Sequence, residues 1–151
     1  MTLTQKETSL LKDMQSQEKL CIEKYQKYGE EAKSSELSAL FSELTAHEQT
    51  HLQTITAMLD GNTPTVSNTP LEANDTHCVA CHYESEADRK ADAFLCQDAL
   101  AMEKHVSSLY DVGVFEFSNP AHRKMLNHIQ SEEQQHGQQL YAYMSQNQMY
   151  G

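Results

Sequence analysis

The sequence is poor in glycine and proline, with five and three residues among 151, and most of these lie between residues 61 and 70 or between 113 and 120. Long stretches without either residue favour continuous helices. The rest of the chain is rich in Leu, Ala, Glu, Gln, Lys and Met, which favour helix. A chain of this length forms one domain with a hydrophobic core. Composition therefore predicts a single all-α domain.

Basic residues are also scarce, because 11 Lys and Arg stand against 22 Asp and Glu, for a formal net charge of −11. This imbalance argues against nucleic acid or an anionic membrane surface as a partner. It suits a protein that attracts cations, and it equally suits one whose charge serves only solubility.

Long apolar runs are missing as well. No segment approaches the roughly 20 apolar residues of a membrane-spanning helix. The first residues, MTLTQKETSLLKDMQ, have neither the basic nor the apolar part of a signal peptide. We therefore expect a cytoplasmic protein, whose four cysteines serve as thiols or ligands rather than as structural disulfides.

Helix-capping patterns divide the chain into two pairs of helices. Each predicted helix begins at a residue that can cap it, and these caps are Thr4 with Glu7, Ser34 or Ser35, Ser85 with Asp88, and Asn119 followed by Pro120. The pattern predicts a four-helix bundle of two hairpins, about 4–60 and about 85–147. Residues 61–84 are polar, show no helical period and can span the bundle as a crossover.

Apolar residues recur at helical spacing in each segment, which predicts the face that each helix buries. The expected core comprises Leu11, Met14, Cys21, Tyr25, Leu37, Leu40, Leu44, Ile55, Met58, Leu100, Val106, Tyr110, Val114, Phe117, Met125, Ile129, Leu140 and Met144.

An internal repeat relates the two halves, because a shift of 85 residues superimposes them. Glu18 then falls on Glu103, Tyr25 falls on Tyr110, and the Glu-x-x-His pattern of residues 48–51 falls on that of residues 133–136. Each half thus contains a Glu, then a Tyr, and later Glu-x-x-His.

The repeated Glu and His residues share the apolar face of their helices, and the six are Glu18, Glu48, His51, Glu103, Glu133 and His136. Glu18 and Glu48 are equidistant from the first predicted turn, and Glu103 and Glu133 are equidistant from the second. Folding each hairpin therefore brings its two Glu residues to the same height in the bundle. Unpaired buried carboxylates are costly, so a cationic partner is needed. Two divalent ions would neutralise four carboxylates, and this donor set suits iron, manganese or zinc. One Glu-x-x-His alone is an accident of an amphipathic helix, whereas two with matched partners indicate a metal site, present or ancestral.

On these residues the sequence resembles the ferritin-like superfamily over both hairpins. That resemblance implies terminal carboxylates at Glu18 and Glu103, bridging carboxylates at Glu48 and Glu133, and histidine ligands at His51 and His136. Two segments are similar in sequence to the Coat F group of spore coat proteins. They are residues 37–59, LSALFSELTAHEQTHLQTITAML, and residues 125–151, MLNHIQSEEQQHGQQLYAYMSQNQMYG. The chain departs from rubrerythrins, because it lacks their domain with two Cys-x-x-Cys pairs and has Val106 where they carry an additional Glu.

Several further residues have two interpretations. Tyr25 and Tyr110 either hydrogen-bond ligand carboxylates and orient them or are ordinary core tyrosines. Cys21 is interpreted as a small core residue. The remaining histidines of the helices are expected at the surface or rim, with His47 and His128 nearest the site, and these are His47, His105, His122 and His128.

The crossover contains His77, Cys78, Cys81 and His82, with the spacing Cys-x-x-Cys-His. This string is the attachment pattern of haem c, but it also suits zinc or iron bound by thiolates, or a reversible dithiol–disulfide pair. An unliganded loop is the remaining alternative.

Three classes of function follow: a di-iron or di-manganese oxidase or peroxidase, a metal-binding protein without turnover, and a structural spore coat protein with a vestigial site. The expected partners are metal ions and other coat proteins, and the sequence leaves room for a homodimer.

Overall fold

The computed structural model describes residues 2–66 and 83–149. Four helices account for most of them: α1 (Gln5–Glu31), α2 (Ser35–Leu59), α3 (Glu86–Glu116) and α4 (Pro120–Gln146). The predicted all-α four-helix bundle is confirmed. The predicted caps are also present, because Thr4, Ser34, Ser85 and Asn119 each accept a hydrogen bond from a backbone N–H in the first turn.

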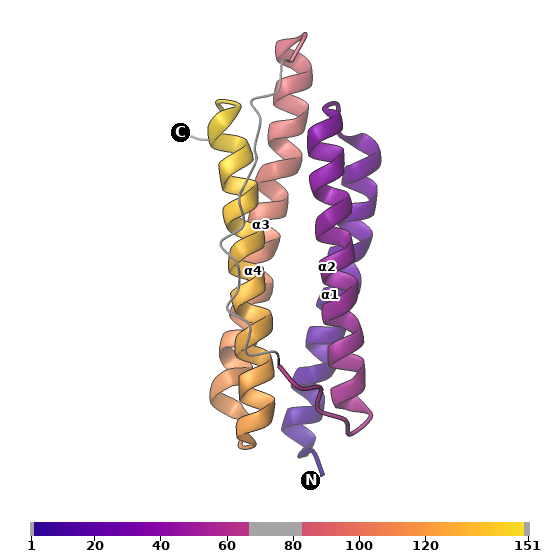
Figure 1. The fold of residues 1–151 in the computed structure, drawn as a ribbon, viewed down its shortest axis with the longest axis vertical. Helices are drawn as coiled ribbons and strands as arrows, with labels where there is room; N and C mark the ends of the chain where they lie inside the picture. Colours follow the sequence, from indigo (N-terminus) through magenta and orange to yellow (C-terminus); the bar gives the residue numbers. More distant parts are fainter. Residues whose placement is uncertain (1, 67–82, 150–151) are drawn as a thin grey trace.

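The helices form two antiparallel hairpins that lie side by side (Figure 1). α1 packs on α2, α3 packs on α4, and the hairpins meet mainly through α1 and α3. α2 and α3 run in the same direction, so α2 ends at one end of the bundle and α3 begins at the other (Figure 1). This order is the arrangement of bundles that contain one long crossover.

The buried core follows the predicted stripes with three corrections. Leu40, Leu100 and Val114 are only partly buried, and their neighbours Phe41, Ala99 and Gly113 hold the interior positions. A Cβ atom on Gly113 would lie 2.6 Å from Met14 Cε, so the packing of α3 requires a small residue there. No helix among the described residues has the length and mean hydropathy needed to cross a bilayer.

A buried aspartate ties the second hairpin to the turn of the first. Asp92 of α3 is 0% exposed and accepts hydrogen bonds from the backbone N–H groups of Lys33 (2.8 Å) and Ser34 (3.0 Å). The Tyr83 hydroxyl donates to the same carboxylate at 2.7 Å. Asp92 thus caps the start of α2 from another helix and fixes the relative height of the hairpins.

Replacing Asp92 by Ala should lower the free energy of unfolding by about 1–3 kcal/mol, because the buried N–H of Ser34 and the partly buried N–H of Lys33 lose their acceptor. Urea denaturation monitored by circular dichroism measures this change. Asp13→Ala, at an exposed position of α1, is the control and should stay within about 0.5 kcal/mol of the parent protein. Equal stability of the two variants would contradict the role assigned to Asp92.

Candidate metal centre

Six ionisable side chains from all four helices meet near the middle of the bundle. They lie on the inner faces because each belongs to the apolar stripe of its helix. Each is at most 2% exposed, and they are Glu18, Glu48, His51, Glu103, Glu133 and His136. The structure thus brings together every residue of the predicted ligand set.

The six side chains form two overlapping groups of four. One group is Glu18, Glu48, His51 and Glu133; the other is Glu48, Glu103, Glu133 and His136. Within each group the ligand atoms lie within 4.8 Å of one another. Since Glu48 and Glu133 belong to both groups, two cations held there would share these two carboxylates.

Both histidines turn Nδ1 toward the carboxylates. Nδ1 of His51 lies 3.3 Å from Glu48 Oε2 and 3.0 Å from Glu133 Oε1. Nδ1 of His136 lies 2.8 Å from Glu48 Oε1 and 3.3 Å from Glu103 Oε1. The imidazole rings are stacked, with centroids 5.7 Å apart. Each ring therefore offers one nitrogen to the centre and keeps Nε2 for an outer partner.

The four carboxyl groups divide into two kinds. Burial raises the pKa of Glu18 and Glu103 well above the usual range, and the adjacent carboxylates of Glu48 and Glu133 raise these values further. Burial also acts to raise the pKa of Glu48 and Glu133, but hydrogen bonds from the other carboxyl groups and the histidines outweigh it and lower both values. Without metal, one carboxyl group of each level pair is therefore protonated and the other is ionised.

The two histidines carry the compensating charge. Burial acts to lower the pKa of His51 and His136, but hydrogen bonds with surrounding carboxylates outweigh it and raise both values well above the usual range. Two imidazolium ions then balance two carboxylates. The directions of these shifts therefore favour four protons among the six side chains, one on each of Glu18, Glu103, His51 and His136.

Three carboxyl oxygens of the centre accept no hydrogen bond from a hydroxyl, amide or imidazole group in the described part of the chain: Oε2 of Glu18, of Glu103 and of Glu133. Buried acceptors without donors are costly in a folded protein. Oxygen and imidazole donors are also the ligands that iron and manganese accept. The donor set, its burial and the unpaired oxygens all fit a pair of divalent cations.

Two buried tyrosines connect the hairpins at the centre. The Tyr110 hydroxyl of α3 donates to Glu18 Oε1 at 2.7 Å, and the Tyr25 hydroxyl of α1 donates to Glu103 Oε1. Both side chains are 0% exposed. Each hairpin thus orients the outer carboxylate of the other one.

The histidines have two outer partners, Glu132, which was missed in the sequence, and His47, which was expected at the rim near the site. Glu132 Oε1 lies 3.3 Å from His51 Nε2 and also contacts His128 Nε2 at 2.9 Å. On the other side, His47 Nδ1 lies 3.1 Å from His136 Nε2. Positions 47 and 132 are equivalent in the repeat, and each directly precedes Glu-x-x-His. That shared position was the available signal.

The remaining predicted residues have separate outcomes. His47 and His128 lie at the rim and His105 is exposed, as expected, but His122 is buried because its ring packs edge-on against Phe117 with centroids 5.7 Å apart. Cys21 is buried in the core, as predicted, and burial raises the pKa of its thiol.

The proposed second site of the crossover, which comprises His77, Cys78, Cys81 and His82, lies outside the described residues.

Comparison with known proteins gives one match, to a family model. Neither the curated proteins nor the solved structures contain a match to this chain. The family model of the Coat F domain matches residues 91–151, which include most of α3 and all of α4 but less than half of the chain. This match supports the similarity of the second hairpin to the Coat F group.

Proposed function

We propose that the chain is a single ferritin-like domain that binds two divalent metal ions and works in the spore coat. Iron is the first candidate for the metal, and manganese and zinc are the alternatives. The observation that carries this proposal is the pair of buried four-ligand groups that share Glu48 and Glu133. Such sharing suits two neighbouring cations better than a set of ordinary buried ion pairs.

Charge balance gives independent support. The pKa shifts favour four protons on the six side chains of the centre, and two divalent cations carry the same charge as four protons. Replacing four protons by two ions therefore leaves the net charge of the centre unchanged, which avoids the high cost of adding charge to the core. A single divalent ion would leave half of the proton-binding groups to be neutralised in another way.

The side chains around the centre have distinct roles in this proposal. Glu18 and Glu103 would each hold one of the two ions, and Tyr110 and Tyr25 hold their carboxylates in place. Glu132 and His47 occupy the outer nitrogens of the histidines and fix the ring orientations. A bound iron or manganese pair would supply redox capacity toward oxygen or peroxide.

The Coat F match supports the biological setting. A coat protein is made in the cytoplasm of the sporulating cell and deposited with other coat proteins, which are then its partners. The competing function is a structural coat protein in which the metal only stabilises the bundle. It is compatible with the same geometry, because the centre joins the two hairpins.

One experiment tests the metal and separates the two functions. Protein purified without chelators should contain about two metal ions per chain, the number that the two ligand groups accommodate. Ferrous iron is then added in air and the absorption spectrum is followed over repeated additions. Catalytic oxidation supports an oxidase, whereas stoichiometric binding without turnover supports the structural function. Absence of bound metal under both conditions would contradict the proposal.

Replacing Glu132 by Gln should weaken metal binding by about 10–100-fold, because the His51 ring loses a charged partner that raises its basicity. Titration with Mn²⁺ against a competing chelator measures this affinity. Glu23→Gln removes the same charge from an exposed position of α1 and should leave the affinity unchanged. Equal Mn²⁺ affinities of the two variants would contradict the role assigned to Glu132.

A further inference from the structure

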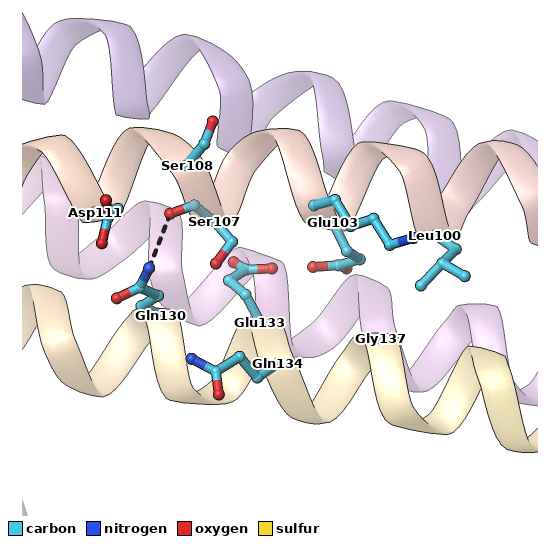
Figure 2. Close-up of a pocket in the computed structure, with 10 residues that line it drawn as sticks. Leu100, Glu103, Ser107, Ser108, Asp111, Gln130, Glu133, Gln134 and Gly137 are labelled. Atoms are coloured by element: carbon cyan, nitrogen blue, oxygen red, sulfur yellow. Dashed lines mark hydrogen bonds between the residues drawn. The ribbon is translucent and has the colours of Figure 1, made fainter.

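A cavity of about 510 Å³ lies between α3 and α4, and two residues of the centre, Glu103 and Glu133, are among those that line it. Its outer lining includes exposed residues such as Ser108, Asp111 and Gln134, and its inner lining includes the buried side chains of Glu103 and Glu133. Figure 2 shows the two glutamate side chains between the helices, with Ser107 and Gln130 beside them. The cavity therefore reaches from solvent to two residues of the candidate metal centre.

The shape of this cavity depends on small residues of the second hairpin. Ser107 and Gly137 line it, and the repeat places Ile22 and Leu52 at the equivalent positions of the first hairpin. In that hairpin Gln15 also donates a hydrogen bond to Thr56 Oγ1 at 3.1 Å, across α1 and α2. The two hairpins thus contribute the same ligand types to the centre but differ in the side chains at these equivalent positions.

The chemistry of the cavity favours a cation. Oε2 of Glu103 and Oε2 of Glu133 are buried and accept no hydrogen bond from a hydroxyl, amide or imidazole group in the described part of the chain, and both residues line the cavity. Further out the lining carries hydroxyl and amide groups and the carboxylate of Asp111, with Lys104 as its one basic residue. Oxygen donors of this kind replace the water ligands of a hard divalent cation in steps.

We infer that this cavity is the passage through which divalent cations reach the centre, and that Ser107 and Gly137 keep it open. The inference rests on the proposed function and adds the side of the bundle, between α3 and α4, from which the cations enter. Gln130 links α4 to α3 at the edge of the cavity, because its side-chain amide donates to the backbone carbonyl of Ser107 at 3.1 Å (Figure 2). Asp111, at an exposed position of the lining, adds negative charge where cations arrive.

The test transfers the side chains of the first hairpin to the second, as Ser107→Ile with Gly137→Leu. A Cβ on Gly137 would lie 3.6 Å from Leu100 Cδ1, an ordinary contact, and Leu favours helix more than Gly does. Gly137→Leu alone is the second variant, for the case in which the double variant does not fold. Gln138→Leu, at the adjacent exposed position outside the cavity, is the control.

Metal-free protein is mixed with Co²⁺, and the visible absorption of bound Co²⁺ gives both the loading rate and the final amount. The double variant should load at least about tenfold more slowly, a rise of about 1.4 kcal/mol in the barrier, with the same final amount as the parent protein. The control should load at the parent rate, and Gly137→Leu alone should show a smaller slowing.

Equal loading rates of parent protein and double variant would overturn the passage while leaving the metal centre intact. A lower final amount in the variant would also overturn it, because the cavity residues would then belong to the binding site itself. Failure of the parent protein to bind Co²⁺ would instead contradict the proposed function, and the passage with it.

Discussion

Replacing Glu48 and Glu133 together by Gln should abolish binding of divalent ions while leaving the bundle folded. Both residues belong to both ligand groups, so the double change removes two charged donors from each group at once. An amide oxygen is a much poorer ligand for iron or manganese than a carboxylate. Metal analysis after dialysis should show a fall from about two ions per chain, the number proposed for this two-metal site, to none.

The fold of this variant should survive because the charges change in a balanced way. In the metal-free protein the carboxylates of Glu48 and Glu133 pair with the protonated His51 and His136. When the carboxylates are lost, the buried histidines can release their protons and become neutral. Far-UV circular dichroism checks the helix content. Glu23→Gln with Glu30→Gln, at exposed positions of α1, is the matched control and should keep full metal content. Full metal content in the double variant of the centre would show that ions bind elsewhere.

Metal affinity should rise steeply with pH. The pKa values of Glu18, Glu103, His51 and His136 are raised, which favours a proton on each of them, and two bound ions would displace these protons. Each ion thus releases about two protons, so its binding constant should rise about 100-fold per pH unit while the pH lies below these raised pKa values. The rise should level off above them, where no proton remains to be displaced.

Two measurements check this expectation. Competition titrations with Mn²⁺ at several pH values give the slope of the binding constant, and an indicator dye in weak buffer counts the protons released at each pH. Both should agree on about two protons per ion. A binding constant independent of pH, or a proton count near zero, would show that the groups bind metal from an already deprotonated state.

The fold and the six side chains of the centre were predictable because the signals are local and repeated. Capping residues such as Thr4 and Asn119 act within one turn of their own helix, so neighbouring residues suffice to recognise them. Glu18 and Glu48 lie at the same height in the bundle because they are equally far along the chain from the turn between α1 and α2. The repeat predicts the same for Glu103 and Glu133.

Other features were not predictable because they depend on contacts between helices. Helical spacing does not distinguish Val114 from Gly113, and the close approach of Met14 decides which one lies inside. Asp92 was missed because its partners, Lys33 and Ser34, belong to another hairpin. Likewise, Glu132 is one of many charged residues in the sequence until the orientation of the His51 ring is known.

The covalent link between the hairpins has a consequence for how such a centre can diversify. In a dimer of identical hairpins, symmetry would copy every substitution onto both sides of the centre. In this chain the two sides vary independently: the repeat pairs Ile22 with Ser107, Leu52 with Gly137 and His47 with Glu132. One side can therefore be specialised for admitting ions and the other for retaining them, an asymmetry that a dimer of identical hairpins does not permit.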